Sequence, residues 1–135
     1  MMREILFKAK RMDNGEWVEG FYAKRHGVPM IYENKDCPQS IYEIAPSTIC
    51  QCTGLTDKNG QKIWENDIMV GHIDDMYPEN STYIRVLWHI NGFCTNENNS
   101  VDIPPIDEFD QKNFEVCGNV FDNPELLEVE NGESR

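Results

Sequence analysis

Turn-forming residues recur at short intervals along this chain, and short runs of β-branched and aromatic residues lie between them. Such spacing is typical of a β barrel or sandwich, because short strands joined by tight turns need Gly, Asn, Asp or Pro at the connections. The sharpest signal is Asn91-Gly92 between Thr82–Ile90 and Phe93–Thr95, since Asn-Gly is the strongest two-residue hairpin signal. The chain is therefore predicted to be mostly β.

Two further hairpins are predicted nearer the N-terminus. In the first, apolar Ile5, Phe7 and Ala9 alternate with polar Lys8 and Lys10. The segment Asp13-Asn14-Gly15 then provides a turn before Trp17–Tyr22. In the second, Val28–Tyr32 pairs with Gln39–Ile44 across a polar segment.

At most one short helix is expected. Pro104-Pro105 precedes Ile106–Asp110, and proline suits a first helical position while acidic side chains suit the positive end of a helix. Phe114–Phe121 is predicted as the last strand, and the polar residues 128–135 as a frayed tail. With 135 residues, the chain has the length of one domain.

The negative charge is concentrated in the second half of the chain. Residues 1–70 hold 9 Lys or Arg and 10 Asp or Glu, whereas residues 71–135 hold 3 and 14. An acidic surface disfavours phosphate backbones and anionic lipid, so a basic partner is more compatible with this sequence than nucleic acid or a membrane. An acidic excess that serves only solubility remains the alternative.

Three features of the sequence indicate the cellular compartment. No stretch approaches the roughly 18 apolar residues of a membrane span, and Met1–Arg11 lacks the apolar run of a signal peptide. The cysteines are odd in number and lack a framework spacing, as in proteins of reducing compartments. An intracellular location is therefore expected.

Neither metal binding nor catalysis is predicted. Cys50-Gln51-Cys52 has one intervening residue where a zinc knuckle has two, so buried free thiols are the preferred interpretation. No nucleophile elbow, metalloprotease helix, P-loop or dinucleotide fingerprint occurs, and Asp74-Asp75 lies in a segment expected to be an exposed loop. No enzyme activity and no cofactor are expected. The side chains able to ligate a metal are those of His26, His72, His89, Cys37, Cys50, Cys52, Cys94 and Cys117.

One group of residues combines basic and aromatic side chains. Trp17 and Tyr22 precede Lys24 and Arg25, and small barrels that bind nucleic acid use aromatic stacking beside basic groups. The preferred interpretation is a half-buried first hairpin with a solvated outer face. Nucleic-acid contact by these four residues is kept as an alternative.

Three segments together resemble the YopX-like family of phage and prophage proteins. Gln51–Ile68 reads QCTGLTDKNGQKIWENDI, close to the family hallmark Q-Y-T-G-L-x-D-K-N-G-x-x-I-Y-E-G-D-I. Arg3–Ala9 resembles the family's opening, R-E-I-x-F-R-A, and Val116–Leu127 resembles its close, V-I-G-N-I-Y-E-N-P-E-L-L. Asn66 stands where the hallmark has glycine, and asparagine is the natural substitute if that turn is left-handed.

The resemblance implies a fold and an origin rather than a reaction. It implies a single β domain over residues 1–127, with an N-terminal β-hairpin region at about 1–47 and a small SH3-like barrel at about 48–127, carried by a phage or prophage in the bacterial cytoplasm. It brings no catalytic or ligand residues. The motif residues are rich in turn chemistry and are interpreted as determinants of the fold: Gly54, Asp57, Asn59, Gly60, Asp67, Gly118, Asn119, Asn123 and Pro124.

Three functional hypotheses follow. The first is a non-enzymatic accessory protein whose acidic C-terminal half binds a basic host or phage protein. The second is a nucleic-acid-binding accessory that uses the N-terminal hairpin. The third is a self-assembling structural component, because the edge strands of an incomplete barrel favour homo-oligomers.

Overall fold

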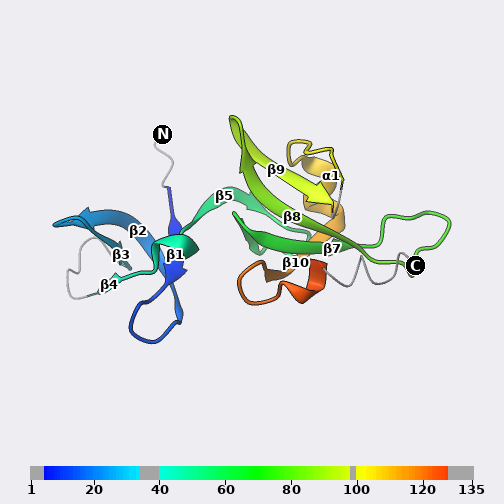
Figure 1. The fold of residues 1–135 in the computed structure, drawn as a ribbon. Coiled ribbons are helices and arrows are strands. Elements are labelled where there is room, and N and C mark those ends of the chain that lie inside the picture. Colours follow the sequence, from blue (N-terminus) through cyan, green and yellow to red (C-terminus); the bar gives the residue numbers. More distant parts are fainter. Residues whose placement is uncertain (1–4, 34–39, 98–99, 128–135) are drawn as a thin grey trace. The chain divides into compact units, whose positions relative to one another are not determined.

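Four antiparallel strands open the chain, and residues with positive φ form the turns between the first three (Figure 1). The computed structural model describes residues 5–33, 40–97 and 100–127. Gly15 has φ +75° in the first turn, and His26 and Gly27 have φ +54° and +82° in the second. The strands are β1 (Phe7–Lys10), β2 (Trp17–Arg25), β3 (Val28–Tyr32) and β4 (Ile41–Glu43).

Both N-terminal hairpins predicted from the sequence are confirmed. Strand β1 pairs with β2 in a register that places Ala9 opposite Val18, and β3 pairs with β4 so that Ile31 lies opposite Tyr42. Strand β2 is longer than predicted and also pairs with β3 through the His26-Gly27 turn. The polar segment between β3 and β4 falls mostly outside the described residues.

Alternation along these strands builds the first of two hydrophobic cores. Side chains two residues apart lie on the same face of a strand. Ala9, Val18 and Ile31 share one face and are buried together with Ile44. Phe7 and Tyr22 pack against this core, with ring centroids 5.7 Å apart.

The chain divides into two compact units, Met1–Cys52 and Thr53–Arg135. Strand β5 (Cys50–Thr56) begins in the first unit, where it pairs with β1, and ends in the second, where β6 (Lys62–Trp64) lies beside it. The remaining strands form a four-stranded antiparallel sheet in the order β10-β7-β8-β9. Their bounds are β7 (Asp67–Gly71), β8 (Thr82–His89), β9 (Gly92–Glu97) and β10 (Phe114–Asn119).

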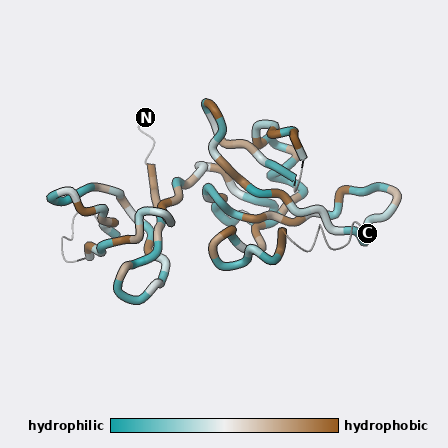
Figure 2. Tube along the Cα trace, in the orientation of Figure 1, coloured by the Kyte–Doolittle hydropathy of each residue, from teal (hydrophilic) through white to brown (hydrophobic). Residues whose placement is uncertain are grey.

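The β8-β9 hairpin is present, but its turn lies one residue earlier than predicted. His89 pairs with Gly92, so Ile90 and Asn91 form the loop and Gly92 belongs to the strand. The positive φ, +62°, falls on Ile90, and the Asn91 amide donates to the His89 carbonyl oxygen at 2.7 Å. A γ-turn centred on Ile90 therefore replaces the expected Asn-Gly turn, at a hairpin tip that Figure 2 colours as hydrophobic.

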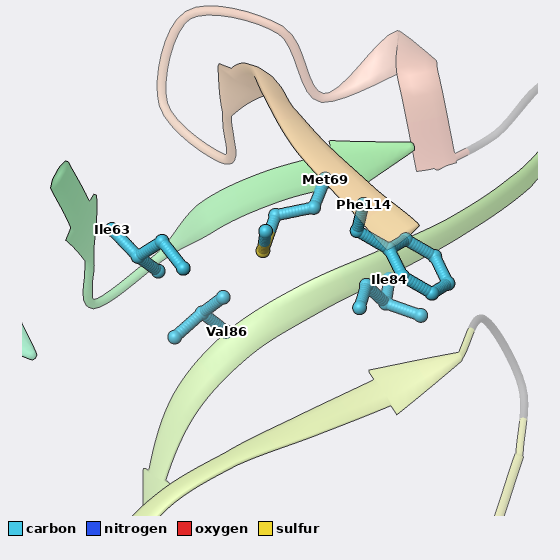
Figure 3. Close-up of a cluster of buried hydrophobic side chains, with 5 residues drawn as sticks. All are labelled: Ile63, Met69, Ile84, Val86 and Phe114. Carbon is cyan, nitrogen blue, oxygen red and sulfur yellow. The ribbon is translucent and has the colours of Figure 1, made fainter. Parts of the chain in front are cut away.

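The second core lies on one face of the four-stranded sheet. Figure 3 shows Met69, Ile84, Val86 and Phe114 pointing toward one another together with Ile63 of β6. Ile84 pairs with Met69 and lies two residues from Val86, so all three share one face of the sheet. Burial of these side chains supplies the main hydrophobic stabilisation of the second unit.

A short helix, α1 (Glu108–Asn113), was expected from the sequence and is present. The Asp107 carboxylate accepts from the Asp110 amide at 3.0 Å, and the Asp110 carboxylate accepts from the Asp107 amide at 3.1 Å, a reciprocal capping box. Beyond this helix, the described residues contain a 3-10 turn at Pro46–Thr48, so the expected maximum of one short helix is exceeded by that turn.

The mostly-β fold is confirmed, but the barrel is not closed. The described strands form two antiparallel sheets, and β10 and β9 are the outermost strands of the four-stranded sheet, with no further named strand paired beyond either. A barrel closes only when all its strands belong to one continuous sheet. Here β5 pairs with β1 and β6 and is not part of the four-stranded sheet, so the two sheets stay separate. No helix in the described ranges is both long enough and apolar enough to cross a membrane.

Candidate functional site

The four basic and aromatic residues considered for nucleic-acid contact do not form one surface. Trp17 lies opposite Lys10, and the ammonium groups of Lys8 and Lys10 lie 4.9 and 5.5 Å from the centroid of its ring. Tyr22 lies on the other face of β2, since it is an odd number of residues away, and packs against the first core.

Lys24 and Arg25 lie at the exposed end of β2. Lys24 is on the face of Tyr22, whereas Arg25 is on the face of Trp17 but about 26 Å away along the strand at 3.3 Å per residue. The structure therefore separates the predicted cluster into a Trp17 site flanked by two lysines and a distant basic strand end.

Arg11 is a further basic residue of this unit, and it is already paired. Its guanidinium donates two hydrogen bonds to the Asp13 carboxylate, at 3.0 and 2.7 Å, and lies 4.2 Å from the centroid of the Tyr42 ring. The hydrogen bond raises the pKa of Arg11 and lowers the pKa of Asp13. This geometry leaves the Arg11 guanidinium engaged within the first unit.

Among the family-motif residues, Asp57 links the β5-β6 turn to strand β10 through its side chain. Its side chain is buried; one carboxylate oxygen accepts from the amides of Asn59 and Gln61, each at 2.9 Å, and the other accepts from the Val116 amide at 2.8 Å. Gly60 completes the turn with φ +81°. The DKNG motif thus shapes the β5-β6 turn and attaches it to β10.

Asp67 has a similar role in the next turn. Its carboxylate accepts from the Trp64 amide at 2.8 Å, and Asn66 between them has φ +73°. Asn66 is thus left-handed, the condition under which asparagine is the natural substitute for the glycine of the hallmark. Its side-chain oxygen also accepts a 3.2 Å hydrogen bond from Arg85, which glycine could not provide.

The closing motif is held by side-chain to backbone hydrogen bonds. The Asn119 side-chain oxygen accepts from the amides of Phe121 and Asp122, each at 2.9 Å, and the Asn119 amide donates to Asn123 at 3.2 Å. Gly118 lies against the Asn123 side chain, where any Cβ would clash. Of the other motif residues, Gly54 has φ +84°, and the carbonyl oxygen of Pro124 accepts from the Leu127 amide at 3.2 Å. These contacts hold the closing segment in its conformation.

The cysteines show no metal geometry in the part of the chain that the structure describes, where no three His, Cys, Asp or Glu side chains converge. Cys50 and Cys94 are buried and form no disulfide, as expected, whereas Cys52 is half-buried and Cys117 is exposed, so the expected burial is wrong for these two. The Cys117 thiol donates to the Ile68 carbonyl oxygen at 3.4 Å, and desolvation raises its pKa to about 11. Cys37 lies outside the described residues.

The candidate site is a cavity of about 270 Å³ in the second unit. One wall is the core-facing side of the β8-β9 hairpin, because Ile84 pairs with Glu97 and side chains two residues apart share a face. The other wall is residues 100–110, held to β9 by a hydrogen bond from the Thr95 amide to the Pro104 carbonyl oxygen at 2.9 Å. The lining residues are Ile73, Thr82, Ile84, Thr95, Glu97, Ser100, Asp102, Pro104, Phe109, Asp110 and Phe114.

The charged side chains that line this cavity, among the residues that the structure describes, are all acidic. Glu97, Asp102 and Asp110 supply carboxylates, and among the described residues no lysine, arginine or histidine lines the cavity. Burial raises the pKa of the Asp110 carboxyl to about 6, and the neighbouring charge of Asp107 acts in the same direction. The cavity therefore offers negative charge above a partly apolar interior.

Sequence reasoning did not identify this cavity. It located the acidic turn at Asp107–Asp110 and the hairpin separately, but their contact depends on the antiparallel bridge between Cys94 and Pro105. No periodicity in the sequence indicates that bridge. The acidity of residues 71–135 was the only available signal.

Comparison with known proteins agrees with this architecture. The model of the YopX protein family matches residues 6–128. The chain belongs to the YopX family. The crystal structure of protein EF1440 from Enterococcus faecalis is similar with a TM-score of 0.59 and 23% identity, over 93% of this chain and 99% of that one, which shows a shared fold. No curated protein matches this YopX-family sequence.

Proposed function

We propose that this YopX-family chain is a phage- or prophage-encoded accessory protein that acts without catalysis, by binding a basic protein in the bacterial cytoplasm. The observation that carries the proposal is the division of charge between the two units. Met1–Cys52 holds 7 Lys or Arg and 7 Asp or Glu, whereas Thr53–Arg135 holds 5 and 17. The whole net charge of -12 therefore belongs to the second unit.

The net charge of -12 already includes the cations of the second unit, and their contacts lie within that unit. Lys58 pairs with Glu115 at 3.6 Å and Lys112 with Glu108 at 3.4 Å, while Arg85 donates to Asn66. A surface of one sign raises the association rate with an oppositely charged partner and makes the complex sensitive to salt.

A nucleic-acid partner has weaker support. Stacking sites for single strands combine several aromatic rings with basic groups in one groove, whereas Tyr22 faces the first core and Trp17 lies on the opposite face of the sheet. The negative second unit would also repel phosphate.

The test is capture of host proteins by the tagged full chain, with and without nuclease, at low and moderate salt. Asp75→Asn with Glu79→Gln removes two exposed charges from the second unit, and Glu16→Gln with Glu19→Gln removes two from the first as a matched control. We expect a nuclease-resistant basic protein whose binding weakens with salt and with the second-unit variant only. If capture disappears after nuclease treatment, the partner is a nucleic acid and not a basic protein. If both variants lose the captured protein equally, the second unit has no special role in binding.

A further inference from the structure

The cavity between the β8-β9 hairpin and residues 100–110 has two chemically distinct parts. Ile84 and Phe114 belong to its apolar interior, and both are buried core residues. Glu97, Asp102 and Asp110 add carboxylates. A ligand that fits both parts needs an aliphatic or planar stem and a cationic end.

Thr95 gives an independent indication of a ligand. It is 5% exposed and lines the cavity, and its side chain lies on the cavity face of β9 with that of Glu97, two residues on. Among the described residues, none forms a hydrogen bond with the Thr95 hydroxyl. Among the described side chains, only Arg85 Nε is both fully buried and without a hydrogen-bond partner, so the Thr95 hydroxyl is open to the cavity, where a donor that enters can form a hydrogen bond with it.

Size and position favour a protein side chain over a free small molecule. The cavity's 270 Å³ is below the roughly 300–1,000 Å³ typical of small-molecule sites. Two apolar residues that line it, Ile73 and Phe109, are themselves exposed to solvent at 39% and 53%. Exposed apolar side chains around a charged recess match the anatomy of a protein interface, where one anchor residue fills a pocket.

We propose that this cavity is the recess for a single lysine or arginine side chain of the basic partner, with Thr95 and the three carboxylates receiving its cationic end. The proposal rests on the function proposed above and specifies which feature of the partner is recognised. The stem packs on Ile84, Phe109 and Phe114. The ammonium or guanidinium donates to the Thr95 hydroxyl and to carboxylate oxygens of Glu97, Asp102 or Asp110.

The test is an amide-shift titration of the full chain by NMR with N-acetyl-lysine amide and N-acetyl-arginine amide at millimolar concentration. N-acetyl-norleucine amide, which has an aliphatic stem without charge, is the matched probe. We expect saturable shifts confined to residues that line the cavity, and binding of the basic probes at least about fivefold tighter than norleucine. Equal responses to the three probes, or no saturable response, would overturn the proposal.

Variants separate the recess from the general acidity of the unit. Thr95→Val keeps the shape and the net charge but removes the hydroxyl, and we expect at least about threefold weaker lysine binding. Thr56→Val makes the same change outside this cavity and should leave binding unchanged. Glu97→Gln alters only the exposed rim, so it remains informative if Thr95→Val fails to fold.

The same variants distinguish the two proposals in the capture experiment. Loss of the basic protein with Thr95→Val or Glu97→Gln supports the recess. Retention of a salt-sensitive protein by both variants refutes the recess and leaves the proposed function standing. Absence of any captured protein from the wild type, despite probe binding in the titration, refutes the proposed function alone.

Discussion

The Asp57 carboxylate accepts a hydrogen bond from the Val116 amide across 2.8 Å, joining two positions 59 residues apart in the chain. The same carboxylate caps the β5-β6 turn through Asn59 and Gln61. One side chain thus couples the hallmark motif to the closing motif of the family. Its removal should affect the stability of the second unit as a whole.

Asp57→Ala is expected to lower the free energy of unfolding by about 3 kcal/mol, because three amide donors lose a charged acceptor and a buried group is deleted. Urea unfolding followed by tryptophan fluorescence measures the change. Asp75→Ala, at an exposed position, is the control and should lie within about 0.5 kcal/mol of wild type. A similar small effect of Asp57→Ala would show that the buried carboxylate is dispensable.

Gly118→Ala is expected to destabilise by about 1–3 kcal/mol. A Cβ there would lie 2.6 Å from the Asn123 side-chain oxygen, which also accepts from the Asn119 amide. Gly92→Ala is the matched control, since nothing lies within 4 Å of its added Cβ. Thermal unfolding of both variants checks the prediction, and equal melting temperatures would contradict it.

Ile90→Gly is expected to stabilise the protein by about 1 kcal/mol. Ile90 has φ +62°, a conformation that is unfavourable for a β-branched residue, and it is 82% exposed, so little burial is lost. Val101→Gly, at a 94% exposed position without positive φ, should not stabilise. Chemical denaturation of the two variants decides the point; destabilisation by Ile90→Gly would mean that the side chain contributes packing at the hairpin tip.

Asp110 should make stability decrease as pH rises. Its pKa is raised from 3.8 to about 6 by burial, so the folded state binds the proton more tightly than the unfolded state. The stabilising contribution is complete below about pH 4 and is lost as pH rises through about 6. Asp110→Asn should remove this dependence, with a difference of about 1 kcal/mol after solvent screening. Denaturant midpoints at pH 4 and pH 7 measure it, and parallel curves for the two proteins would contradict it.

Local signals identified most of the strands. The turn at Asp13-Asn14-Gly15, the left-handed Asn66 and the acidic start of α1 were predictable, because each depends on residues within a few positions of one another. The Asn91-Gly92 turn was misplaced by one residue, since the pairing of Trp88 with Phe93 and of Val86 with Thr95 sets the register over the whole hairpin. Cross-strand pairing therefore decided the position of the turn, and the local preference of Asn-Gly for a two-residue turn did not.

The sequence by itself determined the β class, the family and the excess of acidic residues, all of which follow from composition and from contiguous motifs. Tertiary structure decided which residues meet. Trp17 and Tyr22 separate because strand side chains alternate between faces. Thr95 meets Asp110 at one cavity because the Cys94–Pro105 bridge brings residues 100–110 onto the β8-β9 hairpin. Contacts between distant segments depend on how the whole unit buries its apolar surface, and no short stretch of sequence specifies that.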